Sequence, residues 1–270
     1  MSQGMYRHIN PDSFPQKMEI SFHDEQQRQT LFYEKVTWTI DNENRGLRYG
    51  ENPDQRAALY RLVNGNLCLG EVECIAPGHY LASDVELLQS GKHPGKINIT
   101  DVDSALNILR YLPEHPAVVI VKHNNPSGVA ISERLADSYR KAYLADRIAA
   151  FGGVVAINRE LDRETAELIS QSYSEVVVAP DYAPGTVDLL SSRKNLRIMR
   201  IGNMTRLEEY RTQQVVEFDS LIDGGLILQW SQVPAAHGPA DYAIAECVNK
   251  GTTHRIARMP DEDELRDMHF

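Results

Sequence analysis

The chain has 270 residues, of which 42% are hydrophobic, and this composition is typical of a globular protein with one sizeable core or two modest ones. Its formal net charge of −10 at pH 7 argues against a general nucleic-acid binder, because neutralising phosphates requires clustered lysine and arginine side chains. The longest apolar runs, such as residues 117–121, are strand-sized, so we expect no membrane partner. The three cysteines have spacings unlike a disulfide framework or a zinc site, and we expect a cytoplasmic protein.

The N-terminal part of the chain has a weak pattern. Residues 1–33 are rich in glutamine, histidine and charge, which favours an extension or a poorly packed arm. A strand-like alternation at residues 36–40 follows, and we group residues 1–44 as an arm with a leading strand. Residues 47–53 then form a loop that is dense in hydrogen-bonding groups.

From residue 100 onward, helical and strand patterns alternate. This alternation predicts a layered α/β domain with a mainly parallel or mixed sheet. Thr100 or Asp101 is expected to cap the first helix, and residues 260–270 have the pattern of the first turns of another. The expected strands cover residues 117–122, 153–157, 175–180, 196–201 and 224–230, and the expected helices cover residues 101–109, 133–145, 163–172 and 186–192.

The segment from Lys122 to Gly128 follows a buried strand, at the point where we expect a loop before the next helix. Ligands of open α/β sheets usually bind at the carboxyl ends of strands. Adjacent strand residues point to opposite sides, but a loop onset could turn both Lys122 and His123 toward a cleft. A histidine beside a cation would suit a general base for an amine proton. The alternative is a solvated lysine and a histidine that caps a loop.

Four further residues are candidates for binding. Arg48 and Tyr49 offer a guanidinium for a phosphate and an aromatic face, although an ordinary turn with a surface arginine fits the pattern as well. Gly152 belongs to a glycine pair that permits close backbone approach to a ligand, or a tight turn. Glu175 opens a buried valine run, where the residues alone favour a plain strand-end charge over a ligand contact.

Several motifs of common enzyme classes are absent from the sequence. It has no Walker loop, no Gly-x-Gly-x-x-Gly after a strand, no Gly-x-Ser-x-Gly elbow and no His-Glu-x-x-His. The His-x-Glu and Pro-Cys-x-x-Cys pair of zinc deaminases is missing too. The sequence therefore calls for neither a metal nor a nucleotide cofactor.

Four segments occur in a specific order, although each alone is common. They are residues 47–55 (Leu-Arg-Tyr-Gly-Glu-Asn-Pro-Asp-Gln), 122–128 (Lys-His-Asn-Asn-Pro-Ser-Gly), 150–153 (Ala-Phe-Gly-Gly) and 224–226 (Gly-Gly-Leu). Together they resemble AICAR transformylase, the formyltransferase part of the bifunctional purine enzyme that also carries IMP cyclohydrolase. The resemblance implies a three-layer α/β/α, cytidine-deaminase-like fold without the deaminase zinc, with residues 45–270 as the first such subdomain and a linker toward a second.

The resemblance also implies a reaction. A formyl group would pass from 10-formyltetrahydrofolate to the 5-amino group of AICAR, giving formyl-AICAR and tetrahydrofolate in purine synthesis. His123 would remove the amine proton, and Lys122 would assist it and stabilise charge as the folate amine departs. Family members are homodimers, so a homodimer is expected of the full-length protein. The substrate-binding residues implied by the resemblance are Arg48, Tyr49, Asn125, Gly152 and Glu175.

The sequence departs from the family pattern at three positions. Asp54 stands where the family has histidine, Ser127 replaces a cysteine, and Ala149 replaces a serine, which removes one hydrogen bond to the ligand. The cyclohydrolase domain cannot fit in about 45 leading residues, so that activity is expected to be absent. We also expect the second subdomain to follow Phe270, so the chain alone would be inactive or nearly so.

Two other functions remain open at this point. The chain could be a noncatalytic module that binds a phosphorylated imidazole nucleotide, which nucleotide affinity without turnover would indicate. It could also use the same lysine and histidine to acylate another amine, which a test of the formyl donor would reveal.

Overall fold

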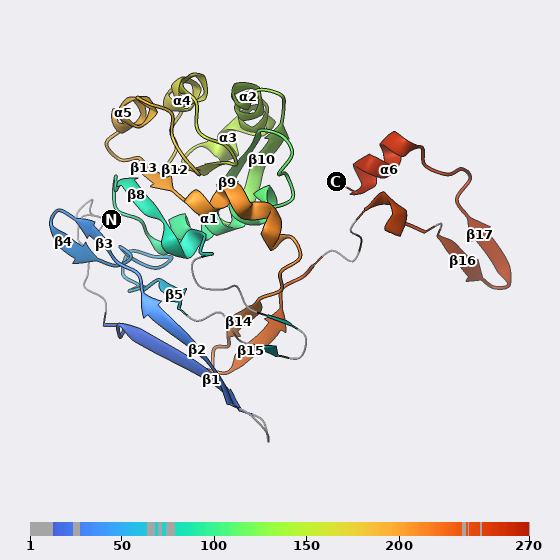
Figure 1. Ribbon diagram of the computed structural model, residues 1–270, viewed down its shortest axis with the longest axis horizontal. Helices are drawn as coiled ribbons and strands as arrows, with labels where there is room; N and C mark the ends of the chain where they lie inside the picture. The colour runs from blue at the N-terminus through green and yellow to red at the C-terminus, as the bar shows by residue number, and fades with distance from the viewer. Residues whose placement is uncertain are drawn as a thin grey trace. The chain divides into compact units, whose positions relative to one another are not determined.

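The computed structural model separates into two compact units, Met1–Val215 and Val216–Phe270. The first unit contains the large sheet (Figure 1), and all of the predicted site residues fall within its residue range. The predicted boundary near residue 45 stays a prediction. The structure describes residues 13–23, 28–63, 68–69, 72–73, 79–233, 236, 238–243 and 245–269.

A six-stranded sheet with the order β10-β9-β11-β12-β13-β8 forms the centre of the first unit. Its strands are β8 (Glu86–Gln89), β9 (Ala117–Lys122), β10 (Asn125–Ile131), β11 (Val154–Ile157), β12 (Val176–Ala179) and β13 (Arg197–Arg200). Among these, the β11–β12 and β12–β13 pairs are parallel and the other three pairs are antiparallel. The predicted α/β class and mixed sheet are confirmed, but the parallel pairs are not the majority, because β9 pairs antiparallel with both β10 and β11 and β8 runs against β13. The cytidine-deaminase-like assignment stays a prediction.

Helices cover both faces of this sheet. They are α1 (Lys96–Leu109), α2 (Leu135–Ala145), α3 (Arg147–Ala150), α4 (Arg163–Ser170) and α5 (Thr186–Ser191). Val119 and Val121 of β9 pack with α1, whereas Val118 and Ile120 pack with the helices on the other face. Figure 1 shows α1 on one side and α2, α4 and α5 on the other. The continuous apolar run in β9 is thus explained by burial of the strand on both faces.

The start of α1 differs from the prediction. Gly95 is the N-cap residue, and its N–H donates to the side-chain oxygen of Asn98 at 3.0 Å. Asp101, which was expected to cap this helix, is instead only 4% exposed inside it. Asp162 caps α4, since its carboxylate accepts from the N–H of Thr165 at 2.7 Å.

The N-terminal region forms strands where an extension was expected. A three-stranded antiparallel sheet contains β1 (Lys17–His23), β2 (Arg28–Lys35) and β5 (Tyr60–Leu62). Leu31 is 1% exposed, but most β1 side chains are exposed, which explains the weak pattern. Residues 1–12 of the predicted arm lie outside the described residues. The unit also contains β3 (Trp38–Ile40), β4 (Glu43–Arg45), β6 (Cys68–Leu69), β7 (Val72–Glu73) and the 3-10 helices η2 (Ala82–Asp84) and η3 (Gly202–Tyr210).

The second unit is built from two hairpins and a helix. Its elements are β14 (Val216–Ser220), β15 (Leu226–Trp230), the 3-10 helix η4 (Pro239–Asp241), β16 (Glu246–Asn249), β17 (Thr252–Arg255) and α6 (Glu262–His269). The strand predicted at residues 224–230 and the helix predicted within 260–270 are confirmed. In the described part of both units, no helix combines the length and the apolar character needed to cross a bilayer.

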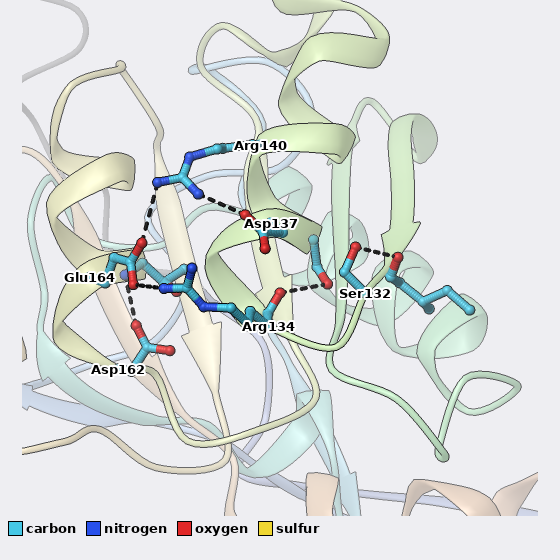
Figure 2. Close-up of polar contacts among 9 residues, drawn as sticks. Ser132, Arg134, Asp137, Arg140, Asp162 and Glu164 are labelled. Carbon is cyan, nitrogen blue, oxygen red and sulfur yellow. Dashed lines mark hydrogen bonds and ion pairs between the residues drawn. The ribbon is translucent and has the colours of Figure 1, made fainter.

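Charged side chains link α2 to α4 at the surface. Arg134 and Arg140 both pair with Glu164, and Arg140 also donates to Asp137 at 2.7 Å (Figure 2). All four side chains are at least 41% exposed, so solvent screens these pairs and each contributes about 0–1 kcal/mol. The packing of the two helices on the sheet therefore does not depend on this network.

Candidate functional site

The predicted residues gather where the strands of the six-stranded sheet end on one side. We call this row of strand ends the sheet edge; it is distinct from the edge strand β10. The carboxyl end of β9 lies there beside the amino ends of β11, β12 and β13, because Val121 pairs with Val154, Val154 with Val176, and Val176 with Arg197. The carboxyl-end rule for open parallel sheets therefore identifies β9 but not its neighbours. Arg197 is the first residue of β13, so it lies at the amino end of its strand, and the rule could not have found it.

Lys122 ends β9, and a two-residue turn joins it to Asn125, the first residue of β10. The two turn residues, His123 and Asn124, have φ of 53° and 60°, as a type I′ hairpin turn requires. The prediction of a loop leading to a helix is therefore wrong here. Pro126 concealed the strand, but proline is tolerated because β10 is an edge strand and the register shifts directly after this residue.

The side chains of the predicted catalytic pair have different surroundings. The ammonium of Lys122 donates to the carbonyl of Phe151 at 2.8 Å, which places it at the loop before β11. His123 is exposed at the tip of the hairpin. The side-chain amide of Asn125 donates to the carbonyl of His123 at 2.8 Å, so Asn125 supports the turn. The imidazole is thus open to a ligand, while the lysine is tethered beside it.

Gly152 adopts a left-handed turn directly before β11. Its φ is 77°, and its N–H donates to the carbonyl of Tyr173 at 2.9 Å. The ring of Tyr173 also packs against Phe151, with 5.1 Å between the ring centroids. The tight-turn interpretation of this glycine is confirmed, and the turn carries the carbonyl that holds Lys122.

Arg48 is buried, so the interpretation of it as an ordinary surface arginine is wrong. It is 9% exposed, donates to the carbonyl of Lys92 at 3.1 Å, and lies 5.2 Å from the ring centroid of Tyr49. The carbonyl of Tyr49 accepts from the N–H of Lys96, the first residue of α1. The ring of Tyr49 lies close to Gly95, because a Cβ added at Gly95 would be 3.3 Å from the nearest ring carbon. The start of α1 thus fixes Tyr49, and the segment directly before α1 fixes Arg48.

Two buried groups hold the carboxylate of Glu175. Its Oε2 accepts from the side-chain amide of Asn98 at 3.2 Å and from the guanidinium of Arg197 at 3.3 Å. Arg197 is 3% exposed and also donates to the carbonyl of His93 at 3.1 Å. The side chain of Glu175 is 39% exposed, so a ligand can still reach the carboxylate. This contact set goes beyond the plain strand-end charge that the residues alone favoured.

The region around His93 is cationic. The ring Nε2 bonds to the carbonyl of Gly46, and the side chain is 4% exposed. Burial lowers the pKa of His93, and the charges of Arg45, Arg48 and Arg197 lower it further. Arg45 pairs with Glu43 at 3.0 Å and Arg197 with Glu175 at 3.3 Å, whereas the guanidinium of Arg48 donates to a backbone carbonyl. These three guanidiniums, which we call the cationic cluster, outnumber the two paired carboxylates, and such an excess suits an anion such as a phosphate.

Asp101 was missed as a site residue by the sequence analysis. Its Oδ1 accepts from the N–H of Asn124 at 2.6 Å, and its Oδ2 accepts from the N–H of His123 at 3.3 Å. Burial raises the pKa of Asp101, the turn hydrogen bonds oppose this, and the charge of Glu175 raises it further. The available signal was a pair of polar residues, Asn98 and Asp101, at inward positions of an amphipathic helix.

The structure also contains a cavity of about 230 Å³ beside the ends of α4 and α5. Residues from the segments 169–174 and 190–196 line it, and none of the predicted site residues does.

In the described part of the chain, no three histidine, cysteine, aspartate or glutamate side chains are placed to hold a metal ion. Cys247 is exposed and free, and Cys74 lies outside the described residues. The candidate site is therefore the open sheet edge rather than this cavity.

Together, these contacts define an α/β protein with a mixed sheet, which carries lysine and histidine side chains at the carboxyl end of β9 and buried arginine side chains near the start of α1. The family model described as "AICARFT/IMPCHase bienzyme" matches residues 14–270, and the chain belongs to this family. The family resemblance carried by the ordered segments is therefore confirmed.

Curated relatives agree with this assignment. The chain is 40% identical over 182 residues to "Bifunctional purine biosynthesis protein PurH" of Myxococcus xanthus, covering 67% of this chain and 33% of the relative. It is 34% identical over 221 residues to the protein of the same description from Acetivibrio thermocellus, covering 82% and 36%. For Sorangium cellulosum the values are 39% over 193 residues, covering 70% and 33%. The chain spans about a third of the length of these relatives.

Proposed function

We propose that the sheet edge is part of a site that transfers a formyl group from 10-formyltetrahydrofolate to the 5-amino group of AICAR. The amine nitrogen attacks the formyl carbon, the bond from that carbon to the folate N10 breaks, and N10 takes up a proton. The products are formyl-AICAR and tetrahydrofolate. Family membership supports the reaction, and the observation that carries it here is the exposed His123 beside the tethered Lys122 and the cationic cluster.

In this proposal His123 is the general base. Its imidazole is exposed at the hairpin tip, where it can reach the amine of a bound nucleotide. Lys122 stabilises the negative charge that develops as the folate amine departs, since its ammonium is held at the same edge by the Phe151 carbonyl. A positioned base contributes about 10²–10⁴-fold to such a reaction.

The remaining predicted residues hold the nucleotide in this proposal. Arg48 and the cationic cluster bind its phosphate, and the ring of Tyr49 packs against it. Glu175 accepts hydrogen bonds from the nucleotide, because Asn98 and Arg197 already fix one of its oxygens. Asn125 and Gly152 line the same place through the turns that they form.

The test uses the full gene product that carries this chain. AICAR binding is measured by calorimetry, and formyl transfer is followed as tetrahydrofolate release. His123→Ala is expected to lower kcat by about 10²-fold or more with nucleotide affinity retained. His115→Ala is the matched control, because His115 is an exposed histidine before the other end of β9 and its side chain is not part of this edge. Binding of AICAR without any formyl transfer by the wild type would refute the proposal and indicate a noncatalytic nucleotide-binding module.

The same proposal includes three broader features of the protein. It takes 10-formyltetrahydrofolate as a co-substrate and needs no metal. The full-length protein is a homodimer, which light scattering of the purified gene product would test. It acts in the cytoplasm, which microscopy of a tagged full-length protein would test. All three depend on family membership rather than on contacts in this chain.

A further inference from the structure

One face of α1 contacts three parts of the candidate site. Asn98, Asp101 and Ser104 are spaced three residues apart, so they lie on the same side of successive helical turns. Asn98 donates to Glu175 at 3.2 Å, and Asp101 accepts from the turn between β9 and β10. Ser104 donates to the side chain of Asn124 at 3.4 Å. A single helix face thus joins the nucleotide-holding carboxylate to the turn that carries the base.

The turn requires support from outside the hairpin. His123 has a φ of 53°, which is uncommon for a residue with a Cβ. The amides of the two residues between paired strand ends lie outside the ladder of the hairpin. The carboxylate of Asp101 accepts from both of them, at 3.3 Å from His123 and 2.6 Å from Asn124. Its two oxygens therefore match the two amides of the turn.

A carboxylate is a costly residue for this position. Asp101 is 4% exposed, and its neighbours Val102 and Ala105 on α1 are fully buried in the apolar core. A buried charge is unfavourable unless hydrogen bonds compensate it, and an apolar residue would extend the buried face of the helix at no such cost. The donors that compensate the charge of Asp101 are the two turn amides. What the carboxylate provides in return is a fixed turn.

We propose that Asp101 is a positioning residue that fixes the imidazole of His123 for formyl transfer by binding both amides of its turn. Asn98 fixes Glu175 from the preceding helical turn, so α1 sets the position of the base relative to the nucleotide. The catalytic part of this inference rests on the proposed function. The part that concerns the geometry of the turn does not.

Hydrogen exchange measured by NMR on the full 270-residue chain tests the geometry. In the wild type, the amides of His123 and Asn124 are expected to be protected, and fast exchange at both would refute the inference whatever the variants do. Asp101→Asn keeps the size of the side chain and one acceptor oxygen but places an N–H against the other turn N–H, so protection is expected to fall at the amide that loses its acceptor and to persist in β9. Asp103→Asn is the control, because Asp103 is an exposed carboxylate on the same helix. Unchanged protection in Asp101→Asn contradicts the inference.

Kinetics on the full gene product test the catalytic part. Asp101→Asn is expected to lower kcat by about tenfold to a hundredfold, because the base is displaced, and to change the KM for AICAR by less than about twofold. Adding Asn124→Gly to this variant is expected to restore part of kcat, because glycine favours the type I′ turn. A purely structural defect would show no such rescue, so its absence contradicts a positioning role. If the wild type transfers no formyl group, the proposed function fails, whereas the exchange experiment still decides whether Asp101 holds the turn.

Discussion

Replacing Gly128 with alanine tests the close approach of β10 and α2. Gly128 is buried, and a Cβ added there would lie 1.9 Å from the carbonyl oxygen of Ala142 in α2. The two atoms would have to separate by about 1.5 Å to reach an ordinary contact of 3.4 Å. Overpacking of a core costs about 1–3 kcal/mol, and this obstacle is backbone rather than a flexible side chain. We therefore expect a loss of about 3 kcal/mol in the free energy of unfolding.

Urea denaturation followed by circular dichroism measures this loss. Gly202→Ala is the matched control, because a Cβ at Gly202 would meet no atom within 4 Å, and it is expected to change the free energy of unfolding by less than about 0.5 kcal/mol. A Gly128→Ala variant as stable as this control would show that β10 and α2 do not approach as described.

Three further predictions concern stability. Asn158→Ala is expected to cost about 3 kcal/mol in urea denaturation, because its 4% exposed amide bonds the first N–H of β9 and two backbone carbonyls before that strand; a loss under about 1 kcal/mol contradicts this. Burial holds the pKa of His93 below its ordinary 6.5, so the free energy of unfolding is expected to fall as the pH drops below 6.5. A His93→Asn variant lacks that part of the decline, and equal declines would refute the assignment. Arg134→Ala removes only exposed pairing with Glu164, and a calorimetric loss above about 1 kcal/mol would contradict this.

The sequence by itself determined the core strands and the family. A run such as residues 117–122 has too many β-branched apolar residues for an exposed segment, so burial on both faces followed from composition alone. The cap of α4 by Asp162 was equally local, because it depends on residues three positions apart. The ordered segments that identify the family are also a property of the chain, and they needed no structure.

Only the tertiary structure decided the direction of the strands and the partners of the site residues. The sequence could not show that Pro126 stands on an edge strand, where its missing N–H removes no ladder hydrogen bond. The pattern after Lys122 therefore predicted a loop where the structure has a hairpin. It also could not show that Asp101 meets the turn amides or that Arg197 meets Glu175, because these contacts join residues 22 or more positions apart. Local patterns record which residues are buried, whereas the pairing of buried polar groups is settled by how the layers pack.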